Sequence, residues 1–192
     1  MVDVESLRET FHKDEVLSIS RRYFISNGFD GTLTSIGVAM GSYLSGVPDG
    51  TTVVGVGVGA AIGLGTSGIW SVWEIERAEK RADLQDIERA MLRDLSDTQL
   101  EQDLLEARIV HALMSGLGPL LGILLPLSAY LLEGTVLTMF EATAVAVAVG
   151  VGVLFAFGAY MGKMASLNWY VAGVRMGLAG LVVAVLNVLL PG

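Results

Sequence analysis

The most regular feature of the chain is the alternation of long apolar segments with short polar ones. Five segments are apolar over about 20 residues or more, the length needed to cross a hydrocarbon core about 30 Å thick. These predicted spans cover approximately residues 23–47, 51–73, 109–132, 135–161 and 167–190. The pattern therefore predicts an all-α, polytopic membrane protein with five transmembrane helices.

The links between the predicted spans are short, with one exception. Residues 47–51 contain a Pro and an Asp-Gly pair that are typical of a tight turn, and the links at 133–134 and 162–166 are equally brief. Only the link after the second span is long enough to fold outside the membrane. The chain thus divides into an N-terminal segment (1–22), spans one and two (23–73), an acidic link (74–108) and spans three to five (109–192).

The long link has the pattern of a short helical hairpin. An apolar stripe recurs at three- and four-residue steps over Leu84, Ile87, Met91 and Leu95. Ser96 and Gln99 then have capping-box spacing, which predicts that a second helix begins near Asp97 and continues into the third span.

Composition supports a membrane bundle. The mean hydropathy is +0.61, and 53% of the 192 residues are hydrophobic, which is too apolar for an ordinary soluble domain. There is no cysteine, so disulfides, thiolate metal ligands and a Cys nucleophile are excluded. Pairs of glycines four residues apart predict close helix packing: Gly37 with Gly41, Gly59 with Gly63, Gly118 with Gly122, Gly158 with Gly162, and Gly173 with Gly177.

The basic residues predict the orientation. All 12 Lys and Arg can be placed on one side of the membrane, and such residues are retained on the cytoplasmic side. The N-terminus and the link at 74–108 are then cytoplasmic, and the C-terminus is outside. The net charge of −8 argues against a nucleic-acid partner.

Asp30 is the charge that the apolar pattern does not explain. A charge in hydrocarbon costs from about 3 to more than 10 kcal/mol, so an intramembrane carboxylate is by default a candidate functional residue. Asn27 and Thr34 lie on the same predicted helix, and Met161 and Met164 lie near the end of the fourth span. These residues could complete a metal-ligand set in which Asp30 also exchanges protons.

Arg175 offers a second interpretation of Asp30. Each residue lies roughly two helical turns inside its span, at about 10–12 Å from the cytoplasmic interface for a rise of 1.5 Å per residue. Arg175 is therefore either part of a transport path or the ion-pair partner that neutralises Asp30, and removing one member of such a pair would leave a costly buried charge.

The acidic link also has two interpretations. It is a solvated helix face with pairs such as Glu76 with Lys80, each worth about 0.3–0.5 kcal/mol. Alternatively, four carboxylates at helical spacing offer hard oxygen ligands to a divalent cation: Glu76, Glu79, Asp83 and Asp86.

The run at 22–34, with its Asp-Gly pair, and the last-span run at 173–181 resemble the vacuolar iron transporter family. The resemblance implies a homodimer that exports Fe²⁺ or Mn²⁺ from the cytoplasm in exchange for protons, with its dimer interface largely on the first span. It would make Asp30 a transport-path ligand and the acidic link a metal-collecting element. The metal is then substrate, and no cofactor is expected.

The chain departs from this family in its second span. Relatives carry a glutamate in the membrane part of that span and a methionine one or two turns later. Residues 52–71 contain neither, and the nearest carboxylates are Glu74 and Glu76 at the cytoplasmic end. The ligand set would therefore differ from that of the relatives.

Three function classes remain open. The leading one is a proton-coupled divalent-metal transporter, which is not an enzyme, in the cell membrane of a prokaryote. The second is a membrane enzyme acting on lipid head groups, since Asp30-Gly31 resembles the start of the CDP-alcohol phosphotransferase motif, although the Ala-Arg expected shortly afterwards is replaced here. The third is a noncatalytic membrane scaffold whose acidic helix binds metal without transport.

Overall fold

The computed structural model describes residues 4–92 and 98–190. Within these residues the regular structure is helical, which confirms the all-α class. The helices are α1 (Val4–Phe11), α2 (Asp14–Leu44), α3 (Gly50–Met91), α4 (Gln99–Leu127), the 3-10 helix η1 (Ser128–Leu132), α5 (Met139–Met164) and α6 (Trp169–Leu189).

Four helical segments are long and apolar enough to cross a membrane, judged by length and composition. They overlap the second to fifth predicted spans and are Gly50–Met91, Gln99–Leu132, Met139–Met164 and Trp169–Leu189. The first predicted span lies in α2, which is not among the four. Asn27, Asp30 and several hydroxyl residues lower the hydropathy of α2, so the count of five spans stays a prediction.

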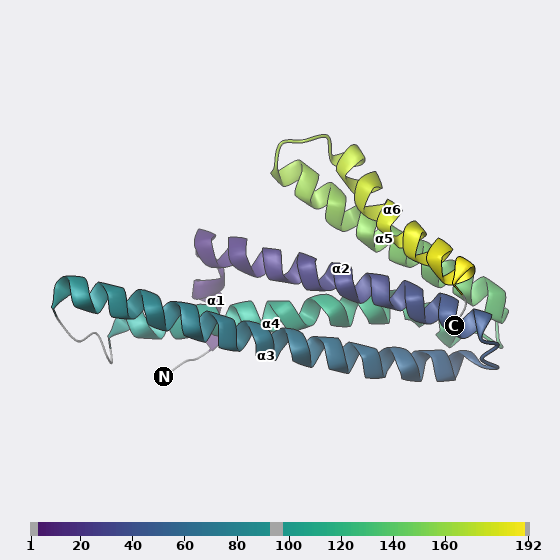
Figure 1. Ribbon diagram of the computed structural model, residues 1–192, viewed down its shortest axis with the longest axis horizontal. Coiled ribbons are helices and arrows are strands. Elements are labelled where there is room, and N and C mark those ends of the chain that lie inside the picture. Colours follow the sequence, from purple (N-terminus) through teal and green to yellow (C-terminus); the bar gives the residue numbers. More distant parts are fainter. Residues whose placement is uncertain (1–3, 93–97, 191–192) are drawn as a thin grey trace.

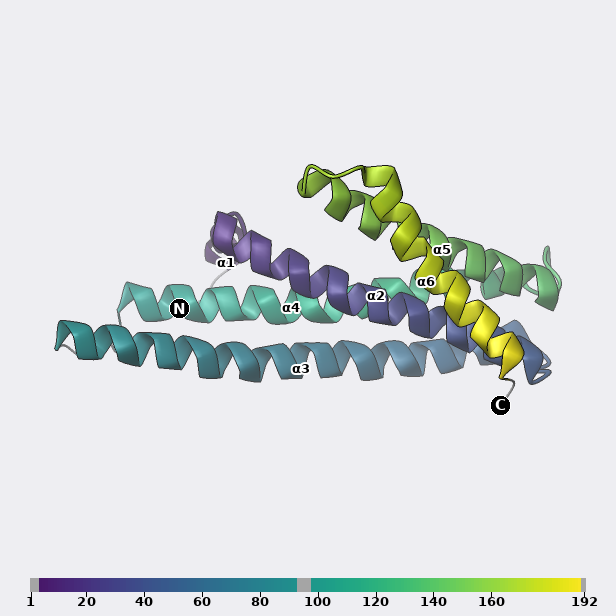
Figure 2. The same ribbon diagram turned by 45° about the horizontal axis from the view of Figure 1, so that its top comes forward.

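The helices form two groups joined by α2. Helix α4 packs against both α2 and α3, while α5 and α6 pack on each other and lean against α2. The α5–α6 hairpin meets α2 near the turn at 45–49 and diverges from it toward the opposite end (Figures 1 and 2). This divergence leaves one side of α2 open near its N-terminal half.

Glycines bring α2 and α4 into close contact. A Cβ atom added at Gly31 would lie 2.6 Å from the Cα of Pro119, and one at Gly122 would lie 2.6 Å from the carbonyl oxygen of Gly28. Because both neighbours are backbone atoms, larger residues would force the helices apart. The sequence-predicted pair Gly118 and Gly122 is therefore at a helix contact, whereas Gly37 has open space around it.

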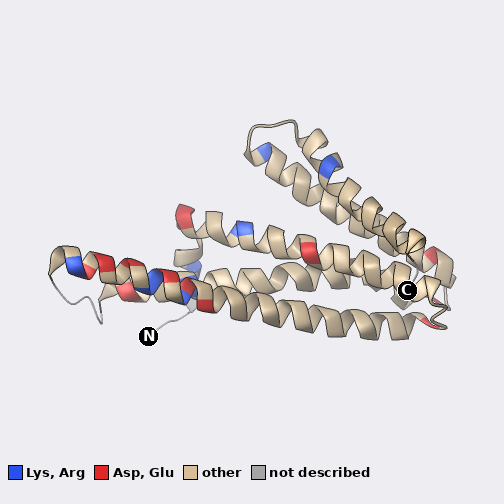
Figure 3. Cartoon of the chain, viewed as in Figure 1, with Lys and Arg blue, Asp and Glu red and all other residues tan. Residues whose placement is uncertain are grey.

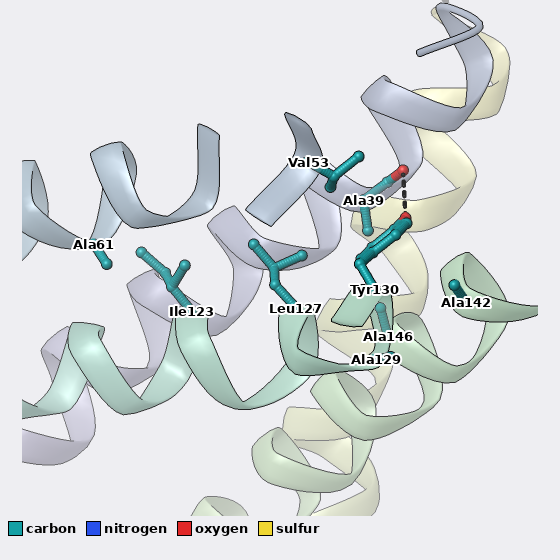
Figure 4. Packing of buried hydrophobic residues seen from close by; sticks show 9 residues of the cluster. All are labelled: Ala39, Val53, Ala61, Ile123, Leu127, Ala129, Tyr130, Ala142 and Ala146. Atoms are coloured by element: carbon teal, nitrogen blue, oxygen red, sulfur yellow. Dashed lines mark hydrogen bonds between the residues drawn. The ribbon is translucent and has the colours of Figure 1, made fainter. Parts of the chain in front are cut away.

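A tyrosine closes the core at one end of the bundle (Figure 4). Tyr130, in η1, is 1% exposed and packs among apolar side chains that include Val53 and Leu127. Its hydroxyl lies 3.3 Å from the Ala39 carbonyl oxygen, to which it donates, and 2.8 Å from the Thr143 hydroxyl. The buried hydroxyl is thus partnered by α2 and α5, which ties η1 to both helices.

Helices α3 and α4 continue well beyond their apolar parts. With 42 residues, α3 is about 63 Å long at 1.5 Å per residue, about twice the thickness of a hydrocarbon core. The charged residues gather on the extended ends of the two helices (Figure 3). The predicted hairpin at 74–108 is thus built from continuations of the two long helices. Leu95, Ser96 and Asp97, on which its predicted cap rests, lie outside the described residues, and α4 begins at Gln99.

Candidate metal centre

A groove of about 540 Å³ opens between α2, α5 and α6. It is lined by Asp30 together with Met161 and Met164, three residues that the sequence predicts as ligands, and also by Met176 of α6. The carboxylate supplies negative charge and the thioethers supply soft sulfur atoms. Such a mixture favours Fe²⁺ over Mg²⁺ or Ca²⁺, which prefer oxygen ligands alone.

Asp30 is exposed in this groove. Among the described residues no hydrogen bond or ion pair reaches its carboxylate. Its backbone carbonyl accepts a hydrogen bond of 2.8 Å from the Thr34 hydroxyl, one turn along α2. Thr34 therefore binds the backbone of Asp30 and not its carboxylate, which keeps its full capacity to accept a cation or a proton.

Asn27 lies one turn before Asp30 on α2, but its side chain is bound to another helix. Its amide Nδ2 donates a hydrogen bond of 2.7 Å to the hydroxyl of Ser115 on α4. The groove at Asp30 is not lined by Asn27. The two residues are neighbours on α2, as the sequence predicts, but they have different environments, because α4 covers the helix at Asn27 and leaves Asp30 exposed.

Arg175 lies on α6 with its side chain exposed. The sequence-based alternative of an ion pair with Asp30 is not what the structure contains, since no salt bridge joins these two described residues. Arg175 directly precedes Met176, which lines the groove, so it lies beside the candidate path without neutralising it. A place for Arg175 in the transport path stays a prediction.

The four link carboxylates have two different environments. Glu79, Asp83 and Asp86 are exposed on α3, and Asp86 lies 3.2 Å from Arg89 in an ion pair. Glu76 is only 2% exposed. Across residues 4–92 and 98–190, no group of three or more His, Cys, Asp or Glu side chains is arranged to hold a metal ion. A ligand role for the exposed carboxylates stays a prediction.

Glu76 is buried where α2, α3 and α4 meet. Its Oε1 accepts a hydrogen bond of 3.0 Å from the Tyr23 hydroxyl, and its Oε2 lies 3.0 Å from Nδ1 of His111. His111 is 1% exposed. The structure therefore removes Glu76 from the solvated acidic face and gives it partners on two other helices.

Sequence reasoning does not find His111 as a partner of Glu76. One signal was available, because Glu76 continues a stripe of small and apolar residues at three- and four-residue steps. The stripe is buried throughout and consists of Gly65, Gly68, Val72 and Glu76. A carboxylate on such a stripe faces a neighbouring helix, where a polar partner is expected.

The guanidinium group of Arg108 lies next to this cluster and packs against an aromatic ring. The guanidinium carbon of Arg108 lies 4.0 Å from the centroid of the Trp73 ring. The Arg108 side chain is half-buried and so partly removed from water. The cation–π contact offsets part of that desolvation and joins α3 to α4 at the start of their charged extensions.

Comparison with known proteins gives three findings. Residues 72–191 match the VIT family, a range that includes Glu76, Met161, Met164 and Arg175. The chain is similar to an uncharacterized protein of Methanocaldococcus jannaschii, with 25% identity over 168 residues, which are 86% of this chain and 85% of that protein. No solved structure matches the chain.

Proposed function

Because the chain belongs to the VIT family, we propose that it transports a divalent metal ion, Fe²⁺ or Mn²⁺, out of the cytoplasm in exchange for protons. The observation that carries this proposal is the groove at Asp30. It combines one carboxylate with Met161 and Met164 from another helix, in a protein whose apolar helices and family identify it as an integral membrane protein.

The groove offers a simple basis for coupling. A divalent ion and a proton compete for the same Asp30 carboxylate, which no neighbouring cation neutralises among the described residues. The ion would be released when a proton from the other side binds Asp30, and the deprotonated carboxylate would then accept the next ion. Binding must be strong enough for entry and weak enough for release, which a single carboxylate with thioethers and water provides.

The proposed topology has five spans, with the N-terminus in the cytoplasm and the C-terminus outside. Helix α2 would be the additional span, and it lies alongside α4, which is apolar enough to cross the membrane (Figure 1). The concentration of charge on the extensions of α3 and α4 supports a cytoplasmic location for these ends (Figure 3).

A homodimer would account for the exposure of Asp30. In a single copy this carboxylate lies on the open side of α2, and facing lipid would cost from about 3 to more than 10 kcal/mol. Gly37 is also on α2 and has open space where a second helix could approach. We therefore place the dimer interface on α2, where a second copy would complete the walls of the groove.

Transport into proteoliposomes tests this function. We expect uptake of Fe²⁺ or Mn²⁺ by the wild type, stimulated by a proton gradient, and loss of most of this uptake in Asp30→Asn, which is isosteric but cannot carry the charge. Asp14→Asn removes an exposed carboxylate in the first turn of the same helix and serves as the matched control.

Two results would contradict the proposal. Asp30→Asn transporting at the wild-type rate would remove Asp30 from the path. Metal binding by the wild type without any uptake or proton movement would favour a noncatalytic metal-binding scaffold.

A further inference from the structure

Three polar side chains that do not line the groove lie close together inside the bundle. Tyr23 comes from α2, Glu76 from α3 and His111 from α4. The side chains of Glu76 and His111 are 3% and 1% exposed, so both are withdrawn from solvent. Three helices thus each contribute one polar side chain to a closed position.

The polar atoms in this position are incompletely paired. Nδ1 of His111 lies 3.0 Å from Oε2 of Glu76, but the contact lacks the alignment of a hydrogen bond. Within the described residues, Oε2 of Glu76 and both ring nitrogens of His111 have no hydrogen-bond partner. Leaving a buried polar atom unpaired costs about 1–3 kcal/mol. These atoms can therefore bind a ligand that the described part of the chain does not supply.

The distance between the two groups fits adjacent ligands of one metal ion. Two ligand atoms that each lie about 2.1 Å from an ion, at a right angle to one another, are about 3.0 Å apart. A carboxylate with a neutral imidazole is a ligand pair for Fe²⁺, Mn²⁺ or Zn²⁺, whereas Mg²⁺ and Ca²⁺ prefer oxygen atoms alone.

We propose that Glu76 and His111 form a buried binding site for a divalent transition-metal ion, separate from the groove at Asp30. Oε2 of Glu76 and a ring nitrogen of His111 are the protein ligands, and water completes the coordination. The Tyr23 hydroxyl holds the other carboxylate oxygen and so orients the ligand, as groups outside the coordination shell commonly do. The site extends the proposed function only in taking the same class of ion, and it does not require transport.

The ligands supplied by the protein suit a site that the ion leaves again. Two protein ligands bind more weakly than the three or four of a catalytic or structural metal site. Tyr23 and Asp30 are seven residues apart on α2, which is about 10 Å along its axis. An ion released from the buried site would therefore have a short distance to travel to the groove.

Pulsed electron paramagnetic resonance with Mn²⁺ tests the site directly. The full chain in detergent is loaded with Mn²⁺, and modulation from a directly bound imidazole nitrogen is measured. The chain has only 2 histidines, His12 and His111, so the signal can be assigned by substitution. We expect nitrogen modulation in the wild type and in His12→Gln, and its loss in His111→Gln.

Binding titrations supply the second measurement. Glu76→Gln and His111→Gln should each raise the Kd for Mn²⁺ by about tenfold or more, since changes to groups that only orient a ligand already cost about 10–100-fold. Glu15→Gln removes an exposed carboxylate in the first turn of α2 and should leave the Kd nearly unchanged. Asp30→Asn should keep the nitrogen signal even where it abolishes uptake, which separates this site from the proposed function.

Absence of nitrogen modulation in the wild type would overturn the proposal and leave a metal-free contact between Glu76 and His111. Loss of the signal in His12→Gln, or its persistence in His111→Gln, would overturn it as well. If His111→Gln does not fold, by circular dichroism and gel filtration, the His12→Gln result decides, because His111 is then the one histidine left.

Discussion

Neighbouring polar residues of α2 lie in opposite environments, because α3 and α4 cover one part of the helix surface and leave the adjoining part open. On the side covered by α3 and α4, Tyr23 reaches Glu76 and Asn27 reaches Ser115. On the open side, Asp30 lines a groove with methionines and no described side chain bonds to its carboxylate. Cross-helix partners therefore satisfy much of the covered side, while the open side keeps a charged group available for an incoming ion.

The difference follows from what covers each side. Glycines let α4 approach the backbone of α2, and at that distance polar side chains can bond across the interface. The α5–α6 hairpin diverges from α2 instead, which leaves space beside Asp30 (Figure 2). One helix thus serves both as a packing element and as one wall of the groove at Asp30.

Disrupting the contact between α2 and α4, on the covered side of α2, should have the largest effect on stability. Gly31→Leu would push a side chain into the backbone of Pro119, and we expect it to destabilise the fold by about 3 kcal/mol. For a chain of this size the unfolding temperature in detergent would fall by roughly 6–12 °C. Gly152→Leu on α5 is the matched control, because Gly152 has nothing within 4 Å, and it should change the stability by less than about 0.5 kcal/mol. Equal effects of the two changes would show that α2 and α4 do not touch at Gly31.

An intermediate effect on stability is expected when the side chain of Glu76 is truncated, and the same change at Asp30 provides the comparison. Glu76→Ala leaves the Tyr23 hydroxyl without its acceptor and removes the carboxylate beside the buried His111 ring, which should cost about 1–3 kcal/mol. Asp30→Ala should change the free energy of unfolding by less than about 0.5 kcal/mol, because its carboxylate is exposed and unbonded. Thermal unfolding in detergent with a chelator present measures both. If Asp30→Ala lowered the free energy of unfolding as much as Glu76→Ala, Asp30 would have to be packed as closely as Glu76.

The smallest effect is expected at the turn between α2 and α3, away from both sides. Asp49 caps α3, and hydrogen bonds from the Thr51 hydroxyl and from Thr52 hold its pKa below the ordinary value for an aspartate. Because the folded-state pKa is the lower one, this contribution to stability is present above the ordinary pKa and is lost as the pH falls through the lowered one.

Asp49→Asn keeps an acceptor for the cap but does not titrate. The wild type should therefore be slightly more stable than this variant near neutral pH, and the difference should shrink in acid. Unfolding temperatures of both proteins across a pH series measure it. A difference that stays constant with pH would show that Asp49 has no lowered pKa in the folded state.

Much of the fold could be predicted from the chain alone. The apolar lengths and the turn signals locate the helices, because a backbone in lipid must form its hydrogen bonds within each segment. The helix boundaries shift where a polar sequence is still a good helix former. For this reason α3 runs without a break past the predicted end at 73 to Met91. Helix α2 likewise begins at Asp14, before the predicted start of the first span.

The site was predictable only in part. Asp30 stands out in any apolar segment, and the structure brings Met161 and Met164 to the same groove. Asn27 and Asp30 are neighbours on α2, yet α4 covers only Asn27, and the sequence alone does not show which neighbouring helix covers a position. The ion pair with Arg175 was inferred from similar depth along two helices, and depth says nothing about which way each side chain points.

What the sequence determined by itself is the helical class, the apolar lengths and the unusual charge at Asp30, since these follow from local composition and periodicity. Only the tertiary structure decided that Glu76 is buried against His111 while Glu79 is exposed. Periodicity assigns each residue to a face of its own helix, but the neighbour that covers that face depends on the packing of all the helices together.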